Sequence, residues 1–179
     1  MKNFVLLLVV LCLPTIVPAG EFKIRAREHF EQHRVKGTNF EEKFRGLSNT
    51  MNFWWEKPYD ISYGFYFSPI IAKLREQQQG SVFGARITFI NLGVETKYHF
   101  QSIDKSLFTR VGLGISQVLP RSDIGNKNGW NIYGGLGYEY PFDNFGMAVE
   151  LAYRYAALQD DIEIISFTPS IGFHFYKSM

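Results

Sequence analysis

The four histidines and the polar groups near them are the residues with which this chain could do chemistry. His29 and His33 stand four residues apart with Glu28 beside them, a spacing that would bring two metal ligands to one helix face. Zinc requires three or four ligands, and no further ligand cluster follows in the sequence. We therefore interpret this segment as a solvated loop and expect no metal site.

A serine-type hydrolase site acting on lipid is the second candidate. Its groups would come from a set of five scattered residues: His99, His174, Ser116, Ser170 and Glu150. Activation of a serine requires a histidine within hydrogen-bond reach, and the sequence contains no adjacent histidine–serine pair of the kind that a deacylase strand would show. We expect these side chains to serve packing, and we predict no catalytic residue, no cofactor and no enzymatic activity.

Two other motifs are weaker. The glycines of 80–84 are not followed by the lysine and helix that a phosphate-binding loop needs. Trp54 and Trp55 could form a binding platform, but paired aromatic residues beside alternating strands are more typical of a membrane-interface girdle.

The chain ends and composition define the setting. Lys2 precedes an apolar run over 4–13, and small residues follow at 17–19, which predicts a cleaved signal peptide over 1–19. The single cysteine, Cys12, lies inside that apolar run and Leu11 precedes it, so a lipoprotein is excluded. The formal net charge is +2 and gives no electrostatic footprint for nucleic acid. No later run is apolar and long enough for a membrane helix.

The elements that must position these groups are strands. Residues 163–176 alternate between apolar and polar with a period of two, over about twice the usual length of a soluble strand. The same alternation recurs in six further segments: 49–55, 59–69, 90–100, 107–117, 130–140 and 145–156. Their apolar faces are rich in aromatic residues near the strand ends, as lipid-facing girdles are.

Charged residues interrupt the polar faces in mid-strand. The carboxylates are Glu95, Glu139 and Glu150, and the cations are Lys97, Arg110 and Arg154, with Arg25 and Arg27 added if a first strand exists. Eight strands enclose a lumen just wide enough to be filled by side chains, so we predict internal salt bridges there, because buried charges must pair. Pro169 predicts a bulge or a local break.

The eighth strand is the open question. A closed barrel needs an even number of strands, and 21–31 alternates well enough to supply the first. Thr38 and Glu41 also resemble a helix capping box, and Phe40, Phe44 and Leu47 recur at helical spacing. We expect a first strand over 21–31, then a variable loop with a helical turn. The domain prediction is 1–19 signal peptide, 20–46 first strand plus polar loop or short helix, and 47–179 barrel.

Several glycine–aromatic segments carry a family resemblance: 111–115, 133–138 and the closing 171–175. With them the chain resembles the OmpA/OmpX-like group of small outer-membrane β-barrels of Gram-negative bacteria. The resemblance implies an all-β, eight-stranded antiparallel up-and-down transmembrane barrel in the bacterial outer membrane, with short periplasmic turns and longer surface loops.

The function implied is structural support or presentation of surface loops, and the alternatives are a lipid-modifying enzyme and a narrow pore. The expected partners are outer-membrane lipid, lipopolysaccharide and the barrel-assembly machinery. We expect a monomer that does not bind nucleic acid.

Overall fold

A computed structural model describes residues 21–56, 61–75, 81–100, 106–120, 125–142 and 145–176. The predicted signal peptide lies outside these residues, as does the predicted turn at 57–58. The backbone of the last strand is described to residue 176, whereas the side chains of Glu28, His174 and Phe175 lie outside the description.

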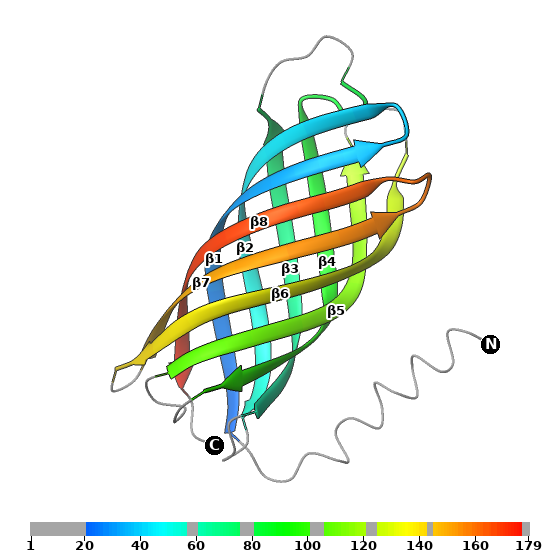
Figure 1. Cartoon of the computed structure of the whole chain (residues 1–179). Helices are drawn as coiled ribbons and strands as arrows, with labels where there is room; N and C mark the ends of the chain where they lie inside the picture. The colour runs from blue at the N-terminus through cyan, green and yellow to red at the C-terminus, as the bar shows by residue number, and fades with distance from the viewer. Residues whose placement is uncertain are drawn as a thin grey trace, which may run out of the picture.

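Eight antiparallel strands form one closed barrel, in which each strand pairs with its neighbours in sequence and β8 pairs with β1 (Figure 1). The predicted fold class is therefore confirmed. The strands are β1 (Glu21–Gly37), β2 (Phe40–Glu56), β3 (Ile61–Leu74), β4 (Arg86–His99), β5 (Ser106–Pro120), β6 (Lys127–Pro141), β7 (Phe145–Leu158) and β8 (Glu163–Tyr176).

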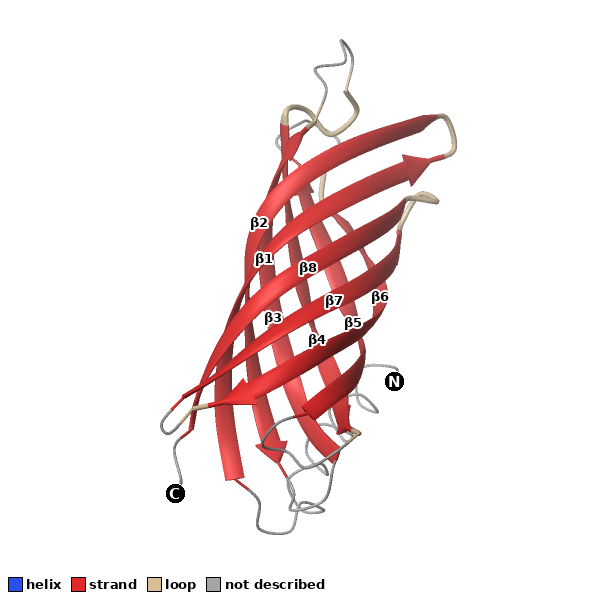
Figure 2. Cartoon of the chain, turned by 60° about the vertical axis from the view of Figure 1, so that its left-hand side comes forward, coloured by secondary structure: helices blue, strands red, loops and turns tan. Residues whose placement is uncertain are grey.

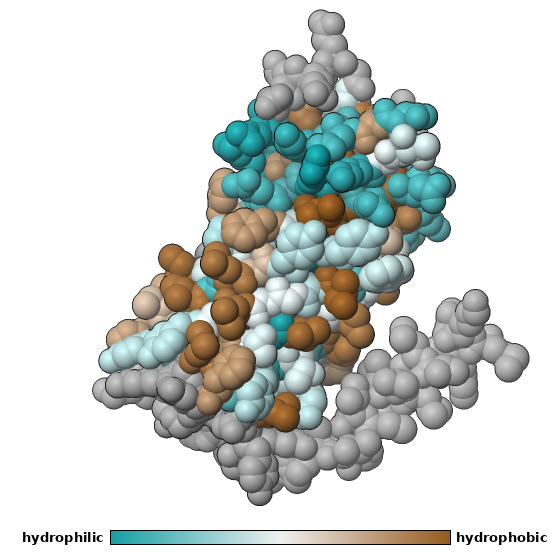
Figure 3. Space-filling view, in the orientation of Figure 1, coloured by the Kyte–Doolittle hydropathy of each residue, from teal (hydrophilic) through white to brown (hydrophobic). Residues whose placement is uncertain are grey.

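Side chains alternate between the lumen and the outer surface along each strand. In β3, for example, Tyr63 and Phe67 are exposed, whereas Ser62, Tyr66 and Ser68 are buried. Around the lower part of the barrel the exposed positions are mostly large and apolar, among them Leu113, Leu136 and Leu151 (Figure 3). A barrel that is apolar outside and polar inside is built to lie in lipid.

No helix within the described residues is long and apolar enough to cross a membrane.

The β1–β2 hairpin corrects the prediction for residues 32–51. The expected loop with a helical turn is wrong: β1 continues to Gly37, a two-residue turn at 38–39 follows, and β2 begins at Phe40. The barrel wall therefore starts at Glu21, and it includes the part of 20–46 for which a polar loop or short helix is predicted. The two longest strands of the molecule form this hairpin, and its tip lies beyond that of the β7–β8 hairpin (Figures 1 and 2).

Two prolines interrupt the wall. Pro169 pairs with Leu151 on β7, but the pairing of β8 with β1 lapses between His29 and Gln32. Pro69 pairs with Ile90 on β4, and the pairing of β3 with β2 lapses between Ser48 and Met51. A backbone N–H points to one of the two neighbouring strands. Because proline has no N–H to donate, the pairing is broken on that side only. The local break predicted at Pro169 is confirmed.

At the end of the barrel opposite to Glu21 and Tyr176, the polarity of the two faces of the wall is reversed. There the lumen is filled by an apolar plug, composed of Val35, Phe44, Ile70, Ala72, Phe83, Ile87, Phe89, Val118, Ala156, Leu158, Ile162 and Ile164. The outer surface around it is hydrophilic (Figure 3). This part thus has the polarity of a water-soluble domain and projects beyond the apolar belt.

The connection 75–85 contributes to the plug. Phe83 is fully buried and meets the ring of Phe40 edge to face, with the ring centroids 5.7 Å apart. The N–H of Val82 donates to the Glu42 carboxylate at 2.5 Å. The described end of this connection is therefore folded into the barrel mouth.

Candidate functional site

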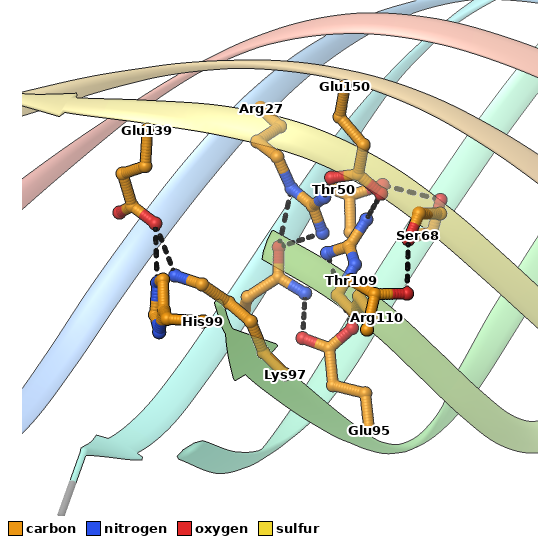
Figure 4. A network of polar contacts seen from close by, with 12 residues as sticks. Arg27, Thr50, Ser68, Glu95, Lys97, His99, Thr109, Arg110, Glu139 and Glu150 are labelled. Atoms are coloured by element: carbon orange, nitrogen blue, oxygen red, sulfur yellow. Dashed lines mark hydrogen bonds and ion pairs between the residues drawn. The ribbon is translucent and has the colours of Figure 1, made fainter. Parts of the chain in front are cut away.

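Arg27 and Glu150 lie at the centre of a polar network in the lumen (Figure 4). Arg27 Nη1 donates to Glu150 Oε2 at 2.6 Å, and its Nε and Nη2 donate to Asn52 Oδ1 at 3.0 and 2.6 Å. The Asn52 amide in turn donates to Glu95. Four strands, β1, β2, β4 and β7, are thereby linked across the interior.

Arg110 completes this central group. Its guanidinium bonds Glu150 and lies 3.3 Å from Glu95 Oε2, so it joins the two carboxylates. All four charged side chains are almost completely buried. The signs balance, as buried charges require.

A second group lies toward the end of the barrel where β1 begins and β8 ends. Lys97 forms an ion pair with Glu139, and His99 Nε2 is 3.2 Å from the same carboxylate (Figure 4). The Lys97 ammonium also lies 5.0 Å from the Phe108 ring centroid, within cation–π range. The His99 ring also meets the Phe108 ring edge to face, with 6.0 Å between the ring centroids.

A third group leads to the apolar plug. Glu31 accepts from Ser48 at 2.6 Å, and Arg154 lies 3.8 Å from its other oxygen. His33 bonds Ser166 at 2.8 Å, and its ring packs at a tilt against Phe89, a residue of the plug, with 4.8 Å between the ring centroids. The polar network therefore meets the apolar plug at His33.

The predicted salt bridges are confirmed for six residues: Glu95, Glu139, Glu150, Lys97, Arg110 and Arg154. Arg27 belongs to the same network, whereas the side chain of Arg25 is outside the description.

The interpretation of His29 and His33 as part of a solvated loop is wrong. Both lie on β1 and point into the lumen, with 4% and 2% exposure. A strand places residues four apart on the same face, as a helix does. Among the described residues no group of three metal-ligating side chains is present.

The candidate hydrolase residues do not converge. Ser116 bonds Asn91 and Asn131, Glu150 is held by two arginines, and His99 lies with Glu139. Ser170 was among the candidates, but its neighbour could not be predicted from the sequence. Its cross-strand partner on β1 is His29, and its partner on β7 is Glu150. Within the described part of the chain, however, no hydrogen bond is formed by Ser170 Oγ or by either nitrogen of His29. The serine therefore lacks the activating contact of a nucleophile.

Glycines on the inner face make room for the rings that fill the lumen. A Cβ on Gly112 would come 2.2 Å from the Tyr133 ring, and one on Gly137 would come 2.4 Å from the Phe108 ring. Tyr133 itself lies under the guanidinium groups of Arg110 and Arg154. Beside these groups a cavity of only about 10 Å³ is left, enough for about one water molecule.

One charged pair lies on the outer surface of the raised hairpin. Arg34 binds Glu41 through two hydrogen bonds of 2.7 and 2.8 Å. These bonds from Arg34 lower the pKa of the Glu41 carboxyl below its ordinary 4.5. The pair braces the hairpin across its two strands.

Comparison with known proteins identifies the fold. No protein-family model and no curated protein matches the chain. Neisserial surface protein A is a similar solved structure, with TM-score 0.61 and 14% identity over 87% of this chain and 97% of that one. Another is Ail of Yersinia pestis, in complex with the heparin analogue sucrose octasulfate, with TM-score 0.57 and 18% identity over 87% of this chain and 99% of that one.

The OmpA/OmpX-like resemblance of the sequence is thus confirmed at the level of the fold. The chain is a transmembrane β-barrel of the bacterial outer-membrane type, with eight strands.

Proposed function

We propose that this chain is a sealed, non-enzymatic membrane anchor that presents a rigid hairpin and its neighbouring loops at the bacterial surface. The observation that carries the proposal is the filled lumen: a charged network lies at the level of the apolar belt, and an apolar plug closes the outer end. Such an interior supports a wall and leaves no path for solute.

The raised hairpin supports the second half of the proposal. β1 and β2 each have 17 residues, against about 9–11 for a strand that only crosses the bilayer. Their outer halves are charged outside and apolar inside, so they stay folded in water. We assign this end to the cell surface because the 11-residue connection 75–85 is there, and outer-membrane barrels carry their longer loops outside.

Surface labelling tests the orientation. An Asn39→Cys variant at the hairpin turn should react with an impermeant maleimide in intact cells, and a Phe142→Cys variant at the opposite end should react only after the outer membrane is opened. The natural Cys12 falls in the predicted signal peptide. The reverse labelling pattern would refute the assignment.

Mass spectrometry of lipid A tests the non-enzymatic half. Cells with and without the protein should give the same spectrum, because Ser170 and His29 are buried inside the wall and form no hydrogen bond with each other. A change of one acyl chain that is lost in a Ser170→Ala variant would establish a lipid-modifying enzyme instead.

A further inference from the structure

A small cavity lies in the lumen beside the ring of Tyr133. Its volume is about 10 Å³, which is room for a single particle of the size of a water molecule or a chloride ion. Three guanidinium groups line it, those of Arg27, Arg110 and Arg154, together with the phenols of Tyr66 and Tyr133. All five residues are more than nine-tenths buried. We name this space the arginine cavity.

The charges around the arginine cavity are of one sign. Among the described residues, no carboxylate lines the cavity. Glu150 binds both Arg27 and Arg110 but is not part of the lining (Figure 4). The Glu31 carboxylate is 3.8 Å from Arg154 Nη1, too far for a hydrogen bond. Cations from β1, β5 and β7 therefore border the cavity without an anion facing them.

Several hydrogen-bond donors of the lining have no acceptor. Within the described part of the chain, no hydrogen bond is formed by Arg154 Nε or Nη1, by Arg110 Nε, or by the Tyr133 hydroxyl. The same holds for both nitrogens of His29, which also lines the cavity. A buried donor without an acceptor is destabilising, so a group of them around one cavity indicates a ligand that accepts hydrogen bonds.

The excess of donors favours an anion over a water molecule. A water molecule accepts two hydrogen bonds and has two of its own to donate, whereas a guanidinium group can only donate. A halide ion accepts hydrogen bonds from every side and donates none. Its charge also strengthens each bond, because hydrogen bonds between charged groups are about twice as strong as those between neutral ones.

We propose that the arginine cavity binds one chloride ion, held by Arg110, Arg154 and the Tyr133 hydroxyl. These three residues lie on β5, β7 and β6, so the ion joins three adjacent strands through one shared ligand. Because the lumen is filled on both sides of the cavity, the ion is taken up when the barrel folds. Only this timing of uptake rests on the proposed sealed lumen.

The test refolds the full mature chain from urea into detergent micelles. One sample contains sodium chloride, and the other contains sodium methanesulfonate at the same concentration, whose anion is too large for the cavity. The midpoint of thermal unfolding is read from the heat-dependent gel shift. Chloride should raise the midpoint by about 3 °C or more, because a ligand that binds only the folded state stabilises it. Equal midpoints in the two salts would overturn the proposal.

Two tyrosine variants form a matched pair. Y133F removes the hydroxyl that has no partner, so it should lose at least half of the chloride shift and keep its midpoint in methanesulfonate. Y66F removes a hydroxyl of the same lining that donates to Asn131 at 2.6 Å. It should lower the midpoint equally in both salts and so keep the shift. An unchanged shift in Y133F, or an equal loss of the shift in Y66F, would overturn the proposal.

Bromide locates the ion directly. Crystals of the chain refolded in sodium bromide should show an anomalous-scattering peak in the arginine cavity, within hydrogen-bond distance of Arg154 and Tyr133. No peak there would leave water as the occupant and overturn the proposal. Crystals refolded in methanesulfonate and then soaked in bromide should lack the peak. A peak in those crystals as well would support the binding site and reject the sealed lumen.

Discussion

Arg110 on β5 and Glu150 on β7 form an ion pair over the strand that separates them, β6. The pair can form because Gly135 of β6 has no side chain: a Cβ there would come within 2.2 Å of Glu150 Oε1. Glu150 also binds Arg27 from β1. One carboxylate therefore joins strands on both sides of the β1–β8 pairing that closes the barrel.

Replacement of Glu150 by alanine should destabilise the barrel strongly. It leaves two buried guanidinium groups without their shared carboxylate, and breaking a buried ion pair costs about 3–5 kcal/mol. Urea unfolding in detergent micelles measures the effect as a lower midpoint. The exposed Glu41→Gln variant serves as control and should lower the midpoint far less, because its pair with Arg34 is in water and contributes at most about 1 kcal/mol. Similar midpoints for both variants would show that the network contributes little.

The glycines of the inner face should resist substitution. Gly112→Ala places a methyl group 2.2 Å from the Tyr133 ring, and overpacking of this kind costs about 1–3 kcal/mol. Gly134→Ala is the matched control, because it faces outward and its Cβ would meet nothing nearer than 3.8 Å. Unfolding midpoints of the two variants should differ clearly. If Gly112→Ala is as stable as Gly134→Ala, the lumen is less tightly filled than described.

Phe83 should hold its connection in the barrel mouth. Phe83→Ala removes a fully buried ring from the apolar plug, so the segment 75–85 should open more often. Limited proteolysis should then cut this segment at least about tenfold faster, since cleavage follows the population of the open form. Ser81→Ala, beside it and only half-buried, should leave the rate near that of the natural chain. Unchanged cleavage in Phe83→Ala would contradict the docking.

The Glu41 carboxyl should titrate below 4.5 in the folded barrel, because Arg34 donates two hydrogen bonds to its charged form. The bracing by this pair is therefore present above the ordinary pKa and is lost as the pH falls through the lowered one. NMR titration of the Glu41 side chain measures this directly. In an Arg34→Gln variant its pKa should return toward the ordinary value, and an unchanged pKa would refute the pair.

The sequence predicts strands well wherever one face meets lipid. From 90 to 176, except near the plug, most outward residues are apolar and many inward ones are polar or glycine, so the period of two appears over most of each strand. The charged residues of the lumen could be named for the same reason, since a mid-strand charge between apolar neighbours must point inward. Their partners could not be named, because pairing across the lumen depends on which inward side chains lie at the same level.

The sequence pattern of the β1–β2 hairpin imitates a helix because the polarity of the two faces reverses part-way along the strands. On β2 Phe44 points inward to the plug, whereas Leu47 points outward to lipid. Inward and outward apolar residues on one strand are an odd number of positions apart, and here the interval is three, which imitates a helix. Arg45, Lys73 and Arg86 are likewise distant in sequence, and only the register of the strands brings them together.

The central claim is that the barrel is a sealed structure, filled at the level of the membrane and plugged at its outer end. Recording of current across planar bilayers tests it most directly, with the purified folded chain added to one side. A sealed barrel should give no channel events above those of the empty bilayer over the usual voltage range. Discrete, reproducible conductance steps from the natural chain would contradict it, because a continuous water path would then exist where the network and the plug now lie.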